Sequence, residues 1–108
     1  MPFFVIDEQP EKEVFHGASI RTLHGEKLMM SFVHLKPHSV VTEHSHPHEQ
    51  MGMVLDGTFE LSIDGDSRIL KKGDAYLIPS NVKHSAKAFD EPAVALDIFS
   101  PPREDYKS

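Results

Sequence analysis

The sequence predicts an all-β fold, either a closed or nearly closed β-barrel or a two-sheet jelly roll. Short apolar runs alternate with turn residues along the whole chain, which is typical of many short strands. No window keeps a helical hydrophobic period over three turns. About ten strands in 108 residues cannot remain one flat sheet with exposed edges, so the sheet must close or fold onto a second layer.

The predicted strands are short, and most of them end at glycine, proline or a charged pair. They cover residues 3–6, 19–23, 28–35, 40–46, 50–55, 58–63, 67–70, 75–78, 84–88 and 94–99. Residues 7–14 could form a turn of helix, but Pro10 interrupts it. Asp64-Gly65 predicts a two-residue hairpin, because both central positions of such a turn need positive φ. Asp56-Gly57 resembles a second turn of this kind.

Length and composition limit the class of protein. A chain of 108 residues with 39% hydrophobic residues predicts one folded domain, 1–108. The net charge is −6 and the eleven Lys and Arg are scattered, which disfavours binding to nucleic acid. No run approaches the ~20 apolar residues of a membrane span, so no membrane association is predicted. Cysteine is absent, which suits a reducing compartment and predicts a cytoplasmic location.

Histidine is the unusual residue, with eight in the chain and three within five positions. Residues two apart on a strand share a face, so His44 and His46 are expected to point the same way and could bind one metal ion. Pro47 must then end the strand, and the chain can return Gln50 to the same face at the start of the next one. Taken alone, this segment could equally be a solvated edge strand.

Two motifs in the correct order resemble those of the cupin superfamily. Residues 44–57 contain His-x-His, then Gln, then Gly after six residues; residues 73–84 contain Gly, five residues, Pro, a short turn and His. The usual glycine before the first motif is missing near Val40. The resemblance implies a single-domain cupin, a jelly-roll β-barrel, that holds one divalent metal ion. The implied ligands are His44, His46, Gln50 and His84.

The reading frame of the first motif decides which side chains are ligands. A frame that starts at His46 would place the fourth ligand at Gly52 or Met53, and neither side chain can serve. His48 and Glu49 are therefore predicted to be rim residues. Gln50 replaces the usual glutamate, so all four protein ligands are neutral and suit Zn, Ni, Fe, Mn or Co.

Two polar residues near the C-terminus are further candidates. Asp97 lies in the apolar run 94–99, where a carboxylate is costly unless it is paired, faces a cavity or reaches solvent. It is predicted either to face solvent at a barrel end or to point into the cavity beside the metal. Arg103 follows two prolines that stiffen the tail, so it could lie over the barrel mouth. It could instead be an ordinary surface arginine, or it could form a salt bridge with Glu104 or Asp105.

A narrower resemblance joins both regions. Residues 44–50 and 97–106 resemble the KdgF-like uronate-linearising cupins. That likeness implies an isomerase of carbohydrate metabolism that opens an unsaturated uronate, or a related sugar acid, to a keto acid. The implied catalytic residues are Asp97, Arg103 and Gln50, and the implied partner is a small anionic substrate. An Fe(II)-dependent dioxygenase and a non-catalytic metal-dependent binding protein remain alternatives. The resemblance also implies a homodimer, in which residues 3–6 could add a strand to the partner.

Overall fold

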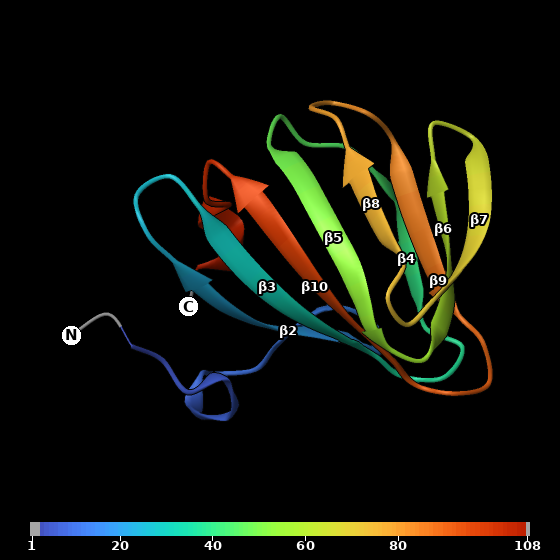
Figure 1. The fold of residues 1–108 in the computed structure, drawn as a ribbon, viewed down its shortest axis with the longest axis horizontal. Helices are drawn as coiled ribbons and strands as arrows, with labels where there is room; N and C mark the ends of the chain where they lie inside the picture. Colours follow the sequence, from blue (N-terminus) through green and yellow to red (C-terminus); the bar gives the residue numbers. More distant parts are fainter. Residues whose placement is uncertain (1–2, 108) are drawn as a thin grey trace.

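Two antiparallel sheets face each other in the computed structural model, which describes residues 3–107 (Figure 1). The larger sheet has the order β1-β2-β3-β10-β5-β8 and the smaller one the order β4-β9-β6-β7. The strands are β1 Lys12–Phe15, β2 Ala18–His24, β3 Met29–Leu35, β4 Val40–His44, β5 Glu49–Asp56, β6 Thr58–Ile63, β7 Asp66–Lys71, β8 Ala75–Ile78, β9 His84–Ala88 and β10 Ala93–Ser100. Two 3-10 turns, η1 Ile6–Glu8 and η2 Glu104–Tyr106, complete the described chain. The jelly-roll fold class is confirmed.

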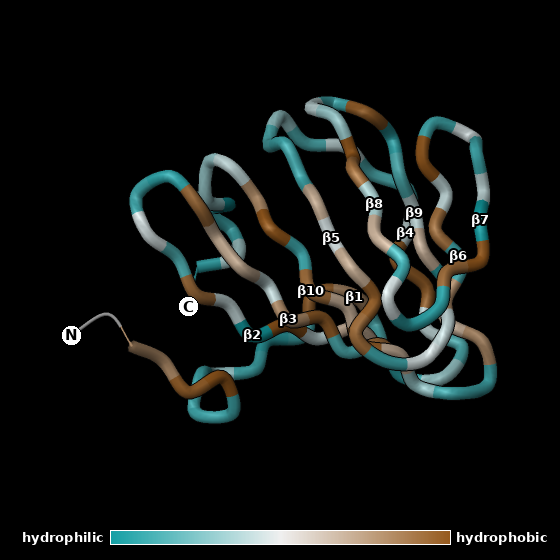
Figure 2. The backbone as a smooth tube through the Cα atoms, in the orientation of Figure 1, coloured by the Kyte–Doolittle hydropathy of each residue, from teal (hydrophilic) through white to brown (hydrophobic). Residues whose placement is uncertain are grey.

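The core lies between the two sheets. Alternate residues of β2 and β10 point inward and are buried, whereas five of the six residues of β7 are exposed. Figure 2 shows hydrophobic residues along the strands and hydrophilic residues in the loops that connect them. The buried apolar cluster consists of Ala18, Leu35, Val54, Phe59, Leu61, Ala88, Ala93 and Ala95. No helix within residues 3–107 is long and apolar enough to cross a bilayer.

The N-terminal strand is the clearest error of the sequence prediction. Residues 3–5 form no strand, and Phe3 is 85% exposed. The first strand is instead β1, which pairs with β2 from Lys12 onward. An apolar run identifies a strand only where a partner edge is available, and here the available edge is taken by the more polar segment that follows. Residues 1, 2 and 108 of the predicted domain lie outside the described part of the chain.

The two predicted turns had different outcomes. Asp64 and Gly65 have φ of 50° and 81°, and β6 pairs with β7 across them, so this hairpin is confirmed. The second expectation is wrong: β5 pairs with β10 and β8, whereas β6 pairs with β7 and β9. Gly57 therefore carries the chain from one sheet to the other. Its φ is +76°, and a Cβ there would lie 2.4 Å from the carbonyl oxygen of Pro92.

A bulge in β4 reorients its last residue. Val41 pairs with Ala86 and His44 pairs with His84, so three steps on β4 match two steps on β9. In a regular strand, residues three apart point to opposite faces, yet Val41 and His44 both line the space between the sheets. The extra residue turns His44 inward, as bulges near functional sites commonly do. The predicted strand 40–46 ends at His44, so His46 follows it in the loop.

Candidate metal centre and its pocket

Three histidine side chains come together where β4 ends and β9 begins, in the smaller sheet. His44 is the last residue of β4 and His84 the first of β9, and their ring centroids are 4.3 Å apart. His46 lies in the loop after β4, with its ring centroid 4.9 Å from that of His84. One ring nitrogen from each of the three lies within 4.8 Å of the others. A cluster of this size could hold a metal ion.

Backbone carbonyls fix the tautomer of each ring. The Nδ1 atoms of His44, His46 and His84 lie 2.8, 3.2 and 2.9 Å from the carbonyl oxygens of Thr42, His48 and Val82. A carbonyl oxygen can only accept, so each Nδ1 carries the proton and donates it. Each Nε2 then has a free lone pair. This is the arrangement in which histidine binds a metal, with the other nitrogen held by a protein acceptor.

The contact between His46 and Gln50 tests whether a cation suits the site. Gln50 Oε1 lies 3.1 Å from His46 Nε2, and the Nε2 atom has no proton when Nδ1 donates to the His48 carbonyl. Two lone pairs thus face the same small space. Burial, together with the charges of Arg103, His84 and the other cluster histidine, lowers the pKa of His46 to about 4, so a second proton is absent at neutral pH. A cation at that point would satisfy both atoms, so the four side chains fit a divalent metal ion.

Burial also lowers the pKa of His84, which therefore stays neutral at physiological pH. Neutral imidazole is the form that ligates metals, because an imidazolium has no free lone pair. Desolvation thus keeps this residue in its neutral, metal-binding form.

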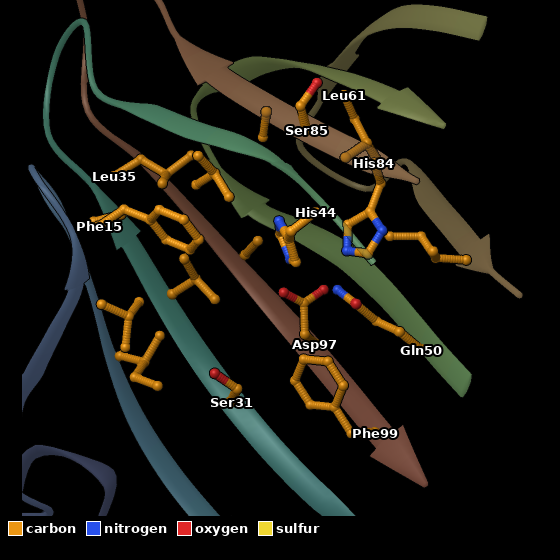
Figure 3. A pocket seen from close by; sticks show the side chains of 18 of the residues that line it. Phe15, Ser31, Leu35, His44, Gln50, Leu61, His84, Ser85, Asp97 and Phe99 are labelled. Atoms are coloured by element: carbon orange, nitrogen blue, oxygen red, sulfur yellow. The ribbon is translucent and has the colours of Figure 1, made fainter. Parts of the chain in front are cut away.

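Asp97 points inward from β10, close to the histidines (Figure 3). It is 8% exposed, and burial raises the pKa of its carboxyl group to about 6. Hydrogen bonds from Tyr76 and Gln50 and the charge of Arg103 oppose that rise in pKa. The Tyr76 hydroxyl donates to Asp97 Oδ1 at 2.7 Å. A carboxyl group with such a pKa can both release and accept a proton near neutral pH.

Arg103 is buried beside the same pocket, 9% exposed, although it lies in the C-terminal tail. Its Cζ lies 3.7 Å from the ring centroid of Tyr106 and 5.3 Å from that of Phe99. One terminal nitrogen binds Asp105 at 3.0 Å, while Nε has no partner within the described residues. The tail itself is held by Thr22, whose hydroxyl donates to the Tyr106 carbonyl at 2.9 Å. A fixed guanidinium with a spare donor is suited to an anionic ligand.

The pocket between the sheets has a volume of about 70 Å³. Its polar end holds His44, His84, Gln50, Asp97 and Arg103, and its other walls are mostly apolar. Figure 3 shows His44, His84, Gln50 and Asp97 converging there, with Phe15 and Leu35 on the opposite side. The polar groups are thus gathered at one end, where a small polar ligand would lie against them.

The structure brings all six of the predicted site residues to this region. Glu49 is exposed and, as the strand neighbour of Gln50, points away from the pocket. His48 is half-buried, with its ring centroid 5.4 Å from that of His46. Sequence reasoning missed Tyr76. The alternation of β8, which turns every second side chain inward, was the signal that could have placed it near Asp97.

A two-sheet jelly roll with three inward histidines defines a small cupin, and residues 31–99 match the family described as the cupin domain. The chain therefore belongs to the cupin family. It is 38% identical over 106 residues to the pectin degradation protein KdgF of Dickeya dadantii (strain 3937), across 96% of each protein.

Two solved structures share the fold along nearly the whole chain. KdgF from Halomonas sp. has a TM-score of 0.91 and 33% identity, covering 99% of both chains. An RmlC-like cupin from Shewanella frigidimarina NCIMB 400 has a TM-score of 0.92 and 26% identity, covering 99% of this chain and 96% of the other. The H2HPP isomerase of Bacillus subtilis is 31% identical over 74 residues, 67% of this chain but only 30% of that protein.

Proposed function

We propose that the protein is a metal-dependent isomerase that opens the ring of an unsaturated uronate, or a related sugar acid, to give a keto acid. The observation that carries this proposal is a carboxyl group with a pKa near neutrality, Asp97, placed beside both a three-histidine cluster and a buried arginine. The similarity to KdgF, whose name refers to pectin degradation, supports a sugar-acid substrate, because pectin is a polymer of uronates.

The proposed metal ligands are His44, His46, Gln50 and His84, and Zn, Ni, Fe, Mn or Co would suit them. When bound, such an ion supplies a Lewis acid that stabilises negative charge on a substrate oxygen. Gln50 has a second role, because its amide also forms a hydrogen bond with Asp97. The amide would thus fix the carboxyl group relative to the substrate.

Asp97 is the proposed proton carrier. It would remove the proton from the anomeric hydroxyl and deliver a proton to the ring carbon of the double bond, which becomes CH₂. The bond between the anomeric carbon and the ring oxygen breaks, the anomeric carbon becomes an aldehyde and the ring oxygen becomes a ketone. No atom or electron is gained or lost, so the reaction needs no oxidant. One group with a pKa of about 6 can perform both transfers.

Arg103 is the proposed carboxylate anchor. Its guanidinium is buried and oriented by two aromatic rings, so it would lose little freedom on binding an anion. The charge of the substrate would then be held at one end of the pocket while its ring faces Asp97. The apolar walls would exclude water from the reacting bonds.

The decisive experiment follows the loss of the ultraviolet absorbance of the double bond after addition of protein to freshly prepared unsaturated galacturonate. Metal-loaded protein should act well above the rate without protein, and Asp97→Asn should abolish turnover with its metal content unchanged. Glu49→Gln, which changes an exposed carboxylate on the neighbouring position, is the matched control and should keep full activity. A wild-type rate equal to that of buffer alone would contradict the proposed function.

Two alternatives have distinct outcomes in the same assay. An Fe(II)-dependent dioxygenase would consume O₂ in proportion to substrate, whereas the isomerisation consumes none. A binding protein would return its ligand unchanged after release.

A cytoplasmic location stays a prediction.

We also propose a homodimer, formed through the outer face of the larger sheet. Met51 lies opposite both Leu77 and Ile98 in the strand register, and these side chains are 55%, 48% and 38% exposed. These three side chains are apolar, so contact between two copies would bury them without desolvating a charge at the centre of the patch. Residues 3–6, which were expected to add a strand to the partner, form no strand within this chain, and their role in a dimer stays a prediction.

Molar mass from light scattering tests the dimer. Met51→Lys should convert the protein to a monomer, because it places a charge at the centre of the buried patch. Ile69→Lys is the matched control: this residue is 65% exposed on the other sheet and should leave the dimer intact. A wild-type protein that is monomeric at all concentrations would contradict the proposal.

A further inference from the structure

Tyr76 and Asp97 lie in contact although their strands do not pair. In the larger sheet, β5 separates β8 from β10, and Gly52 is the register partner of both Tyr76 and Asp97. Strands next to each other are about 4.8 Å apart, so these two backbones are separated by about twice that distance. A tyrosine side chain can span this distance only if no side chain on β5 lies in its path.

Gly52 leaves the gap open. A Cβ at this position would lie 2.3 Å from Asp97 Oδ1 and 2.4 Å from the ring of Tyr76. Both distances are shorter than real Cβ contacts, so any other residue at position 52 would push the phenol and the carboxylate apart. Gly52 has no positive φ, so the requirement comes from the space above the residue and not from its backbone conformation.

The phenol uses this space to donate a hydrogen bond of 2.7 Å to Asp97 Oδ1. Burial, and then the neighbouring carboxylate, raises the pKa of Tyr76, so the hydroxyl keeps its proton and stays a donor. One carboxylate oxygen is thus held against the sheet. The other oxygen is left for Gln50 and the pocket. Without the hydrogen bond, rotation of the carboxyl group would exchange the two oxygens.

We propose that Tyr76 is a positioning residue for Asp97, and that Gly52 is required because it lets the phenol reach across β5 to the carboxylate. This inference rests on the proposed function for its catalytic consequence. The contact fixes which oxygen of Asp97 faces the substrate, so its loss lowers the rate of proton transfer more than it weakens substrate binding.

The kinetic test compares Tyr76→Phe and Gly52→Ala with the wild type. Each variant should lower kcat about tenfold or more while KM stays within about twofold and bound metal is unchanged. The matched control is Gly57→Ala, which creates a 2.4 Å clash with the Pro92 carbonyl oxygen instead of with Asp97 or Tyr76, and should lower the melting temperature without changing the kcat of the folded protein. A Tyr76→Phe variant with kcat within twofold of the wild type would overturn the inference.

A second measurement separates this inference from the proposed function. Tyr76→Phe should lower the melting temperature in the wild-type background, but not in an Asp97→Leu background, where no acceptor exists for the phenol. Equal shifts in both backgrounds would overturn the contact itself. Absence of uronate turnover by the wild type, with the coupling of melting temperatures intact, would reject the proposed function and leave the positioning of Asp97 established.

Discussion

Ser31 and Asp97 are register partners on β3 and β10, yet only one of the two side chains is satisfied. Asp97 accepts a hydrogen bond from Tyr76, whereas the hydroxyl of Ser31 has no partner within residues 3–107. Ser31 is fully buried, with 0% of its surface exposed. A buried polar group without a partner costs roughly 1–3 kcal/mol, so this position opposes folding in the free protein.

Ser31→Ala should therefore stabilise the protein, by about 1 kcal/mol in urea unfolding. Thr22→Val is the matched control on the neighbouring strand, because Thr22 is the register partner of Ser31 and its hydroxyl does bind the Tyr106 carbonyl. It should destabilise by about 1 kcal/mol. If Ser31→Ala instead destabilises as much as Thr22→Val, the hydroxyl has a partner in solution.

The ring of Tyr106 orients Arg103 from a distance of 3.7 Å, so it should control binding of the anionic substrate. Tyr106→Ala should raise KM about tenfold with a smaller change in kcat, because a cation over an aromatic ring gains up to about 2 kcal/mol when desolvated. Tyr106→Phe keeps the ring and should keep KM. Steady-state kinetics with both variants decides the point, and equal KM values for Ala and Phe would exclude a role for the ring.

Gln50→Glu should separate metal affinity from turnover. A carboxylate at this position would bind a divalent ion more tightly than the amide does, so a chelator should remove the metal more slowly. The same change removes the N–H that forms the hydrogen bond with Asp97 and places two carboxylates together, so turnover should fall at least tenfold. Metal retention and kcat are measured on the same samples. A variant with wild-type kcat would show that the amide donor is dispensable.

The three-histidine cluster was largely predictable from the sequence because residue identity and spacing carry the information. His44, Gln50 and His84 reach one region through loops and turns of fixed length. The reason given for His44 and His46 was incomplete, since His46 lies beyond the strand. A bulge opposite His84 turns His44 inward, and no local residue pattern predicts this bulge.

Other parts of the site depend on pairing between distant strands. The Tyr76–Asp97 contact requires the order β8-β5-β10, which hydrophobic alternation alone does not provide. The strand β1 also depends on pairing. Lys12 and Glu13 are exposed and polar, and they form a strand because the edge of β2 is free. Tertiary pairing overrides local propensity in such places.

Two buried groups with opposite pKa shifts should set the acid stability of the metal-free protein. The pKa of His46 falls from 6.5 to about 4, so between these values the unfolded chain binds the proton and stability falls as pH falls. The pKa of Asp97 rises from 3.8 to about 6, so in that window the folded protein binds the proton and stability rises as pH falls. Each shift corresponds to about 3 kcal/mol, and the two nearly cancel.

Removal of one group should expose the other. Chelator-treated Asp97→Asn cannot gain stability from protonation at position 97, so its free energy of unfolding should fall by on the order of 2–3 kcal/mol between pH 6.5 and pH 4. The wild type should change much less over the same range, and His84, whose pKa is also lowered, contributes to the loss in both proteins. Urea unfolding at several pH values measures both curves. Parallel curves for the two proteins would mean that Asp97 titrates in the folded protein as it does in the unfolded chain.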